Sequence, residues 1–236
     1  MNTFGRTNPS SQDQGIESAG QFRAGRLAQL EQYYLMPSPF VLHLVPLHPP
    51  ANPVNLAGNH ELLSQRIPPP IWGRGRPNSD GFFIQEQERG MNQAHVQYFS
   101  HGAVEVYVGG TAQDYPRLGR RVIWGEDVEN QAVVQVEHLV QVLGQLGVRP
   151  PLAVLLSLLD VQGAALISTR ADRFRSDLSG GIAQRDLLLP PAIIPTHDAD
   201  VPAALHPVFD LLWQATGWPQ SPTYSAEGAW GGSRRL

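Results

Sequence analysis

The segment from Asp80 to Val108 constrains the fold of this chain most strongly, because it has the pattern of three consecutive antiparallel strands. Its last two strands are rich in Val, Tyr and Phe and flank a short turn at His101 and Gly102. A two-residue loop with glycine second suits a type I′ turn, whose twist matches that of the flanking strands. A strand over 80–86 is expected to join this hairpin through a second glycine-containing turn. We therefore predict a β-meander.

The predicted two-residue loop also fixes the pairing within the hairpin. In this register Phe99 lies opposite Val104, and Tyr98 lies opposite Glu105. Apolar and polar residues mix on both faces of the hairpin, so both faces are expected to be partly covered. The glutamates of the meander, Glu105 among them, are expected to form a solvated face.

Hydrophobic periodicity predicts helices on both sides of the meander. From Ser18, a stripe of Phe22, Arg26 and Leu30 repeats at helical spacing and predicts a helix of about four turns. Residues 150–159 are ambiguous, because their leucines favour a helix whereas their length and the following turn favour a strand; we expect a strand paired with 164–168. The other predicted elements are strands at 40–47, 122–124, 186–189 and 193–194, a helical turn at 61–65, and helices at 127–146 and from about 200 to 216.

These elements predict an α+β fold, in which a mainly antiparallel sheet with a β-meander packs against a long central helix and a C-terminal helix. Residues 1–17 are polar and are expected to form a disordered tail. A single α+β domain is expected over 18–230, followed by a flexible tail at 231–236. The chain has no apolar signal segment and no unbroken apolar run of membrane-spanning length, so we expect a cytoplasmic protein without membrane association.

Composition excludes several kinds of chemistry. All 17 basic residues are arginine and the chain has no cysteine. Without lysine there is no Walker A loop and no Schiff base for pyridoxal phosphate. Without cysteine there are no thiol nucleophiles, disulfides or cysteine-ligated metal sites. A net charge of −4 argues against a general electrostatic grip on nucleic acid, although a local basic patch stays open. We expect no cofactor.

A glycine-rich loop offers the clearest candidate binding residues. Trp72, Arg74 and Arg76 place two guanidinium groups beside an aromatic ring, a pattern that binds phosphate or carboxylate or stacks on a base. Tyr98 of the meander joins them as a candidate ligand- or partner-binding residue. The same loop also fits an ordinary solvated turn, since only two positive charges are involved.

The remaining polar residues favour structural roles over catalysis. His43, a histidine in an otherwise apolar strand, and the run His197-Asp198-Ala199-Asp200 raise the question of a metal site. An aspartate before Val-Pro is also typical of a helix N-cap, which we prefer. Ser157 lies among leucines and lacks the Gly-x-Ser-x-Gly elbow of serine hydrolases. We predict no catalytic and no metal-ligating residues.

Several short motifs together carry a resemblance to a known family. In order, they are Arg26-Leu27, FVLHLVPL, SDGF, YFSHGAVEVY, PPLAVLLSLLDVQG and FDLLWQATG, followed by Gly228 and Trp230. This series resembles the C-terminal region of bacterial Schlafen-type AlbA-like proteins, which are described as putative ATP-binding or DNA-binding proteins. The AlbA-like domain, to which that family's nucleotide or nucleic-acid binding is assigned, has no counterpart in this chain.

The resemblance implies an accessory domain beside an AlbA-like ATP-binding partner. We therefore expect a non-catalytic role in protein-protein contact or ligand sensing. The alternative is a nucleic-acid-associated protein that uses the arginine-containing loop. A hydrolase with a histidine and carboxylate site is the third hypothesis.

Overall fold

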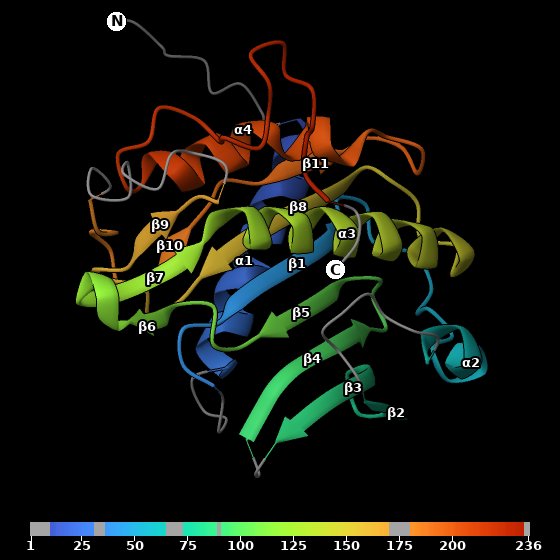
Figure 1. The fold of residues 1–236 in the computed structure, drawn as a ribbon. Coiled ribbons are helices and arrows are strands. Elements are labelled where there is room, and N and C mark those ends of the chain that lie inside the picture. Colours follow the sequence, from blue (N-terminus) through green and yellow to red (C-terminus); the bar gives the residue numbers. More distant parts are fainter. Residues whose placement is uncertain (1–9, 31–35, 65–72, 89–90, 170–179, 234–236) are drawn as a thin grey trace, which may run out of the picture.

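The computed structural model of the chain describes residues 10–30, 36–64, 73–88, 91–169 and 180–233. A large antiparallel sheet runs through the middle of the molecule (Figure 1). Its strands, in spatial order, are β10 (Leu187–Leu188), β8 (Leu152–Leu158), β1 (Phe40–Pro46), β5 (Val104–Val108), β4 (Met91–Phe99), β3 (Gly81–Glu88) and β2 (Arg74–Pro77), and β11 (Ala192–Ile194) also pairs with β8. The predicted meander is confirmed as β3, β4 and β5.

A second sheet contains β6 (Gln113–Tyr115), β7 (Arg120–Trp124) and β9 (Ala165–Ile167). Strand β9 runs parallel to β7. The predicted strand at 150–159 is confirmed as β8, but its predicted pairing with 164–168 is wrong. Strand β8 pairs with β1 on one side and with β10 and β11 on the other, so no edge of β8 is left for β9.

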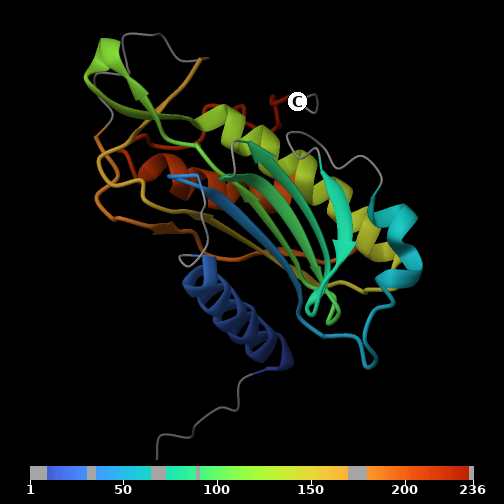
Figure 2. The same cartoon turned by 90° about the horizontal axis from the view of Figure 1, so that it is seen from below.

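Helices cover both faces of the large sheet. Helix α1 (Ser11–Leu30) lies on one face, and α3 (Gly125–Gln145) and α4 (Val201–Gln214) lie on the other (Figure 2). The remaining helical segments are η1 (Ala57–Asn59), α2 (His60–Leu63) and η2 (Pro116–Leu118). The predicted α+β class, with a long central helix and a C-terminal helix against the sheet, is confirmed.

The main hydrophobic core lies between the sheet and the pair α3 and α4. Apolar side chains of α3 repeat at helical spacing and are fully buried, as are alternate residues of β1. Helix α4 begins where the sequence predicted. The Asp200 carboxylate caps it by accepting a hydrogen bond from the Ala203 N–H at 3.2 Å. A smaller core under α1 contains Ala19, Val45, Leu47, Phe99, Ala103, Ala153 and Leu155.

The β4–β5 hairpin has a different register from the one predicted. Its loop contains three residues and is closed by a hydrogen bond from the Phe99 N–H to the Ala103 carbonyl at 2.9 Å. The third loop residue, a glycine, has a φ of 89°, as a three-residue hairpin loop requires. Glu105 therefore lies opposite Gln97, not opposite Tyr98. This shift of one residue places Glu105 and Tyr98 on opposite faces of the sheet.

Helix α1 starts at Ser11, seven residues before the predicted start at Ser18. Ser10 and Asp13 cap it reciprocally: the Asp13 N–H donates to Ser10 Oγ at 3.2 Å, and the Ser10 N–H donates to Asp13 Oδ2 at 3.1 Å. Residues 11–17 therefore belong to the helix, so the predicted disordered tail is wrong for them. Residues 1–9 lie outside the described part of the chain.

Alanine substitution is expected to have opposite effects on stability at two glycines of α1. A Cβ at Gly15 would lie 2.7 Å from the Leu47 carbonyl oxygen, whereas nothing lies within 4 Å of a Cβ at Gly20. We expect Gly15→Ala to destabilise the protein by about 1–3 kcal/mol through overpacking. We expect Gly20→Ala to stabilise it by up to about 1 kcal/mol through helix propensity. Urea denaturation measures both, and a stabilised Gly15→Ala would contradict the close docking of α1 on Leu47.

None of the helices among the described residues is long and apolar enough to cross a lipid bilayer.

Candidate functional site

A buried ionic cluster joins α1 to the middle of the sheet. It consists of Arg26 from α1, His43 from β1, His95 from β4 and Glu105 from β5, and we refer to it as the Glu105 cluster. The Arg26 guanidinium binds both carboxylate oxygens, with Nη2 to Oε1 at 2.8 Å and Nε to Oε2 at 3.0 Å. His43 Nε2 lies 3.0 Å from Oε2, and His95 Nε2 lies 3.1 Å from Oε1. Each carboxylate oxygen therefore has two hydrogen-bond partners.

The register of the sheet brings these residues together. Glu105 of β5 lies opposite His43 of β1 on one side and opposite Gln97 of β4 on the other. His95 lies two residues before Gln97 on β4. Side chains two residues apart on a strand share a face. All three therefore point toward α1, where the helical stripe of Phe22, Arg26 and Leu30 predicted from the sequence meets the sheet.

The cluster is almost closed to solvent. His43 and Glu105 are fully buried, and the Arg26 side chain keeps 14% of its surface exposed. Burial opposes the ionised form of Glu105, but hydrogen bonds from His43, His95 and Arg26 outweigh it and hold the pKa well below the usual range. Burial lowers the pKa of His43, so this ring is neutral and donates its Nε2 proton to the carboxylate. The Arg26 guanidinium is a cation in direct contact with this carboxylate.

Aromatic rings enclose the cluster. Phe22 meets the rings of His43 and Phe99 edge to face, with centroids 5.5 and 5.2 Å apart. His95 stacks on Tyr107 with centroids 5.1 Å apart, and the Arg26 Cζ lies 4.9 Å from the centre of the Phe99 ring. These rings restrict access of water and strengthen the electrostatic interactions among the charged groups.

This arrangement is suited to holding a charge and not to transferring a proton. A general base needs a lone pair within reach of its substrate. The oxygens of Glu105 already accept hydrogen bonds from Arg26, His43 and His95, and the carboxylate is fully buried. The geometry therefore supports a role in positioning α1 or in recognising a cation.

A cleft of about 460 Å³ opens beside Arg26. One wall is α1, and the other is formed by the β2–β3 turn and the β4–β5 hairpin loop. The lining residues are Gln21, Phe22, Gly25, Arg26, Gln29, Ser79, Asp80, Phe99, Ser100 and His101. We refer to this feature as the hairpin cleft. Amide, hydroxyl and aromatic groups line it, together with the ionisable side chains of Arg26, Asp80 and His101.

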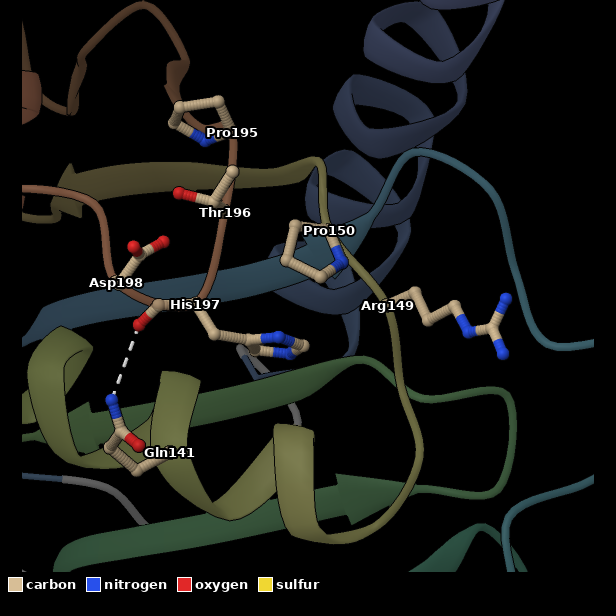
Figure 3. A pocket seen from close by; sticks show the side chains of 7 residues that line it. All are labelled: Gln141, Arg149, Pro150, Pro195, Thr196, His197 and Asp198. Atoms are coloured by element: carbon tan, nitrogen blue, oxygen red, sulfur yellow. Dashed lines mark hydrogen bonds between the residues drawn. The ribbon is translucent and has the colours of Figure 1, made fainter.

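A second, wider groove of about 650 Å³ lies between the end of α3 and the β11–α4 connection (Figure 3). His197 Nε2 lies 3.0 Å from the Val148 carbonyl, and Gln141 donates to the His197 carbonyl at 3.2 Å. Arg149 and Asp198 extend toward opposite sides of the view in Figure 3. The charged groups of Arg149 and Asp198 therefore do not converge on one point of the groove.

A second buried carboxylate, Glu129 of α3, lies on the far side of the sheet. Its oxygens accept hydrogen bonds from Trp213 Nε1 at 2.8 Å, from Ser221 Oγ at 2.6 Å and from the Thr223 hydroxyl. Burial raises the pKa of Glu129 to about 7, although these three donors partly oppose the shift. The carboxyl ties α4 and the C-terminal segment to α3.

The structure does not bring the predicted binding residues into one site. Trp72 lies outside the described residues, and Arg74 lies in β2 opposite Gln85. Arg76 is exposed at the edge of the sheet, with its Cζ 6.0 Å from the centre of the Phe83 ring. Tyr98 is only 1% exposed and belongs to the main core. Tyr98 therefore faces away from the surface on which Arg76 lies.

The sequence analysis missed the Glu105 cluster. It assigned Glu105 to a solvated face, which is wrong, because the three-residue hairpin loop turns this side chain toward α1. A signal was present nonetheless. His43 is a polar residue in an apolar strand, and Arg26 occupies the stripe through which α1 contacts the sheet. Polar residues at positions expected to be buried indicate a shared buried network.

Within the described part of the chain, no group of three or more histidine, aspartate or glutamate side chains is arranged to hold a metal ion. Comparison of the chain with protein-family models, curated proteins and solved structures gives no significant match.

Proposed function

We propose that this chain is a non-catalytic accessory domain that binds a partner protein through α1 and the hairpin cleft. The partner that we propose is a protein carrying an AlbA-like ATP-binding domain, in keeping with the resemblance described above. The observation that carries the proposal is the combination of the Glu105 cluster with the hairpin cleft. The charged groups of the cluster bind one another, while the cleft beside them is open and lined by hydrogen-bonding and aromatic groups.

The composition of the cleft supports a protein as ligand. Gln21, Gln29 and Ser79 are exposed and offer both donors and acceptors, whereas Phe22 and Phe99 supply an apolar floor. An apolar centre with a polar rim is the usual anatomy of a protein interface. The outer face of α1 is also exposed and polar, so it can form part of the same contact surface.

Two glycines of α1 provide a test with a matched control. Gly25 lines the cleft, Gly20 does not, and nothing lies within 4 Å of a Cβ built at either position. A leucine at Gly25 would add an apolar side chain at the wall of the cleft, and a leucine at Gly20 would make the same chemical change outside it. We expect Gly25→Leu to weaken partner binding by about tenfold or more, the effect of losing about 1.4 kcal/mol, and Gly20→Leu to leave it unchanged.

The measurement is isothermal titration of the full chain with a purified protein that carries an AlbA-like ATP-binding domain. Binding by the unsubstituted chain and by Gly20→Leu, together with weaker binding by Gly25→Leu, supports the proposal. The absence of binding to such a protein, or equal affinities for the two leucine variants, would overturn it.

A further inference from the structure

The Glu105 cluster has the geometry of a receptor for a guanidinium group. The carboxylate presents both oxygens to the fork formed by the Nε and Nη2 of Arg26, at 3.0 and 2.8 Å. The Phe99 ring lies under the Cζ at 4.9 Å. A planar guanidinium can donate two parallel hydrogen bonds and stack on the ring at once, whereas an ammonium group cannot donate this pair.

The receptor belongs to the sheet and not to the helix that fills it. His43, His95, Phe99 and Glu105 come from β1, β4 and β5, which pair with one another in a continuous antiparallel ladder. Among the four residues of the cluster, Arg26 alone comes from α1. The acceptor site is therefore part of the sheet, and its hydrogen-bond requirement can be met by any guanidinium that reaches the same place.

Helix α1 is also held outside the cluster: Ile16, Phe22 and Leu27 pack against buried residues, and the Arg23 guanidinium donates to the Leu189 carbonyl at 2.7 Å. Its buried residues are Gly15, Ala19 and Leu30, two of which have small or absent side chains. Gly20 and Gly25 face open space, and exposed glycine costs about 1 kcal/mol relative to alanine in a helix. An isolated helix of this length and composition is marginal in water. The Arg26–Glu105 pair therefore contributes to the docking of α1 together with these other contacts.

The hairpin cleft gives an approach to that pair. Arg26 lines the cleft and keeps 14% of its side-chain surface exposed. An incoming chain in the cleft would lie beside the guanidinium that it has to replace. A buried carboxylate with no cation near it is strongly unfavourable, so Arg26 leaves readily only when another cation takes its place.

From these observations we propose that the Glu105 cluster is an exchangeable guanidinium site: Arg26 is its resident ligand, and an arginine of the partner protein displaces it from the carboxylate and weakens the attachment of α1, while the other contacts keep the helix docked. This inference rests on the proposed function, since it assigns a chemical group to the partner that enters the hairpin cleft. The exchange conserves charge, because one arginine replaces another on the same carboxylate. The weaker attachment of α1 would then report that the partner is bound.

Chemical rescue tests the site. In Arg26→Ala, we expect propylguanidinium to raise the melting temperature and to bind about tenfold or more tightly than propylammonium, because only the guanidinium satisfies both carboxylate oxygens. The double variant Arg26→Ala with Glu105→Gln should show no preference between the two ligands. Equal responses of Arg26→Ala to both ligands, or no response to either, would overturn the proposal.

If Arg26→Ala does not fold, hydrogen exchange on the unsubstituted chain tests the same proposal. Propylguanidinium should accelerate exchange of the α1 amides (Ser11–Leu30) relative to propylammonium, while exchange in α3 stays unchanged. Equal α1 exchange with the two ligands contradicts the proposal. If the AlbA-like partner binds but propylguanidinium does not compete with it, partner binding stands and the guanidinium site is wrong.

Discussion

Replacing Arg26 with methionine is expected to lower the free energy of unfolding by about 3–5 kcal/mol, because the buried carboxylate of Glu105 loses the arginine that makes two hydrogen bonds to it. The methionine keeps most of the apolar stem, so the loss reflects the missing charge and hydrogen bonds. His43 and His95 still donate to Glu105, but burial keeps His43 neutral. Urea denaturation at neutral pH measures the change.

Two further variants show whether the loss of stability comes from the buried charge of Glu105. Arg117 is exposed on η2 and is part of no ion pair among the described residues, so Arg117→Met should change stability by less than about 0.5 kcal/mol. Adding Glu105→Gln to Arg26→Met should recover part of the loss, since the buried charge is removed. If Arg26→Met is no more destabilising than Arg117→Met, the cluster does not hold α1 in the way described.

The second large effect is a pH dependence that arises at Glu129. Burial raises the pKa of this carboxyl from 4.5 to about 7 in the folded protein. Because the folded state binds the proton more tightly, this contribution to stability is fully present below about pH 4.5 and is lost as the pH rises through about 7. The whole effect is on the order of 3 kcal/mol, from about 1.4 kcal/mol per pKa unit.

Glu129→Gln isolates this contribution, because glutamine resembles the protonated carboxyl and can still pair with the Trp213, Ser221 and Thr223 side chains. The difference in unfolding free energy between the variant and the unsubstituted chain should grow in favour of the variant from pH 5 to pH 8, by roughly the amount just given. The lowered pKa values of Glu105 and His43 have the opposite effect, because their contributions to stability are lost as the pH falls. Both proteins contain these two residues, so this effect cancels in the difference. Parallel stability curves over this range would refute the raised pKa of Glu129.

Most of the fold follows from local patterns in the sequence. The 3.6-residue period of α3 and the Asp200 cap of α4 are set within a few residues, and both were predicted. The meander follows from β-branched and aromatic runs separated by glycine-containing turns. The partners of β9 could not be predicted in this way, because pairing depends on which strand edges other strands already occupy.

The candidate site depends on a detail finer than these patterns. Both a two-residue and a three-residue loop fit the sequence around Gly102, yet they place Glu105 on opposite faces of the sheet. The sequence does not decide between them locally. The face that receives Glu105 is decided by its pairing with His43 on β1, more than sixty residues away along the chain.

By itself, the sequence determined the α+β class, the meander, the helices and the chemistry excluded by the absence of lysine and cysteine, because each of these depends on composition or on short-range periodicity. Only the tertiary structure decided that Arg26, His43, His95 and Glu105 form one buried site. Their meeting depends on strand register and on the docking of α1, which are set by long-range packing and hydrogen bonding and leave no local signature beyond a few polar residues at buried positions.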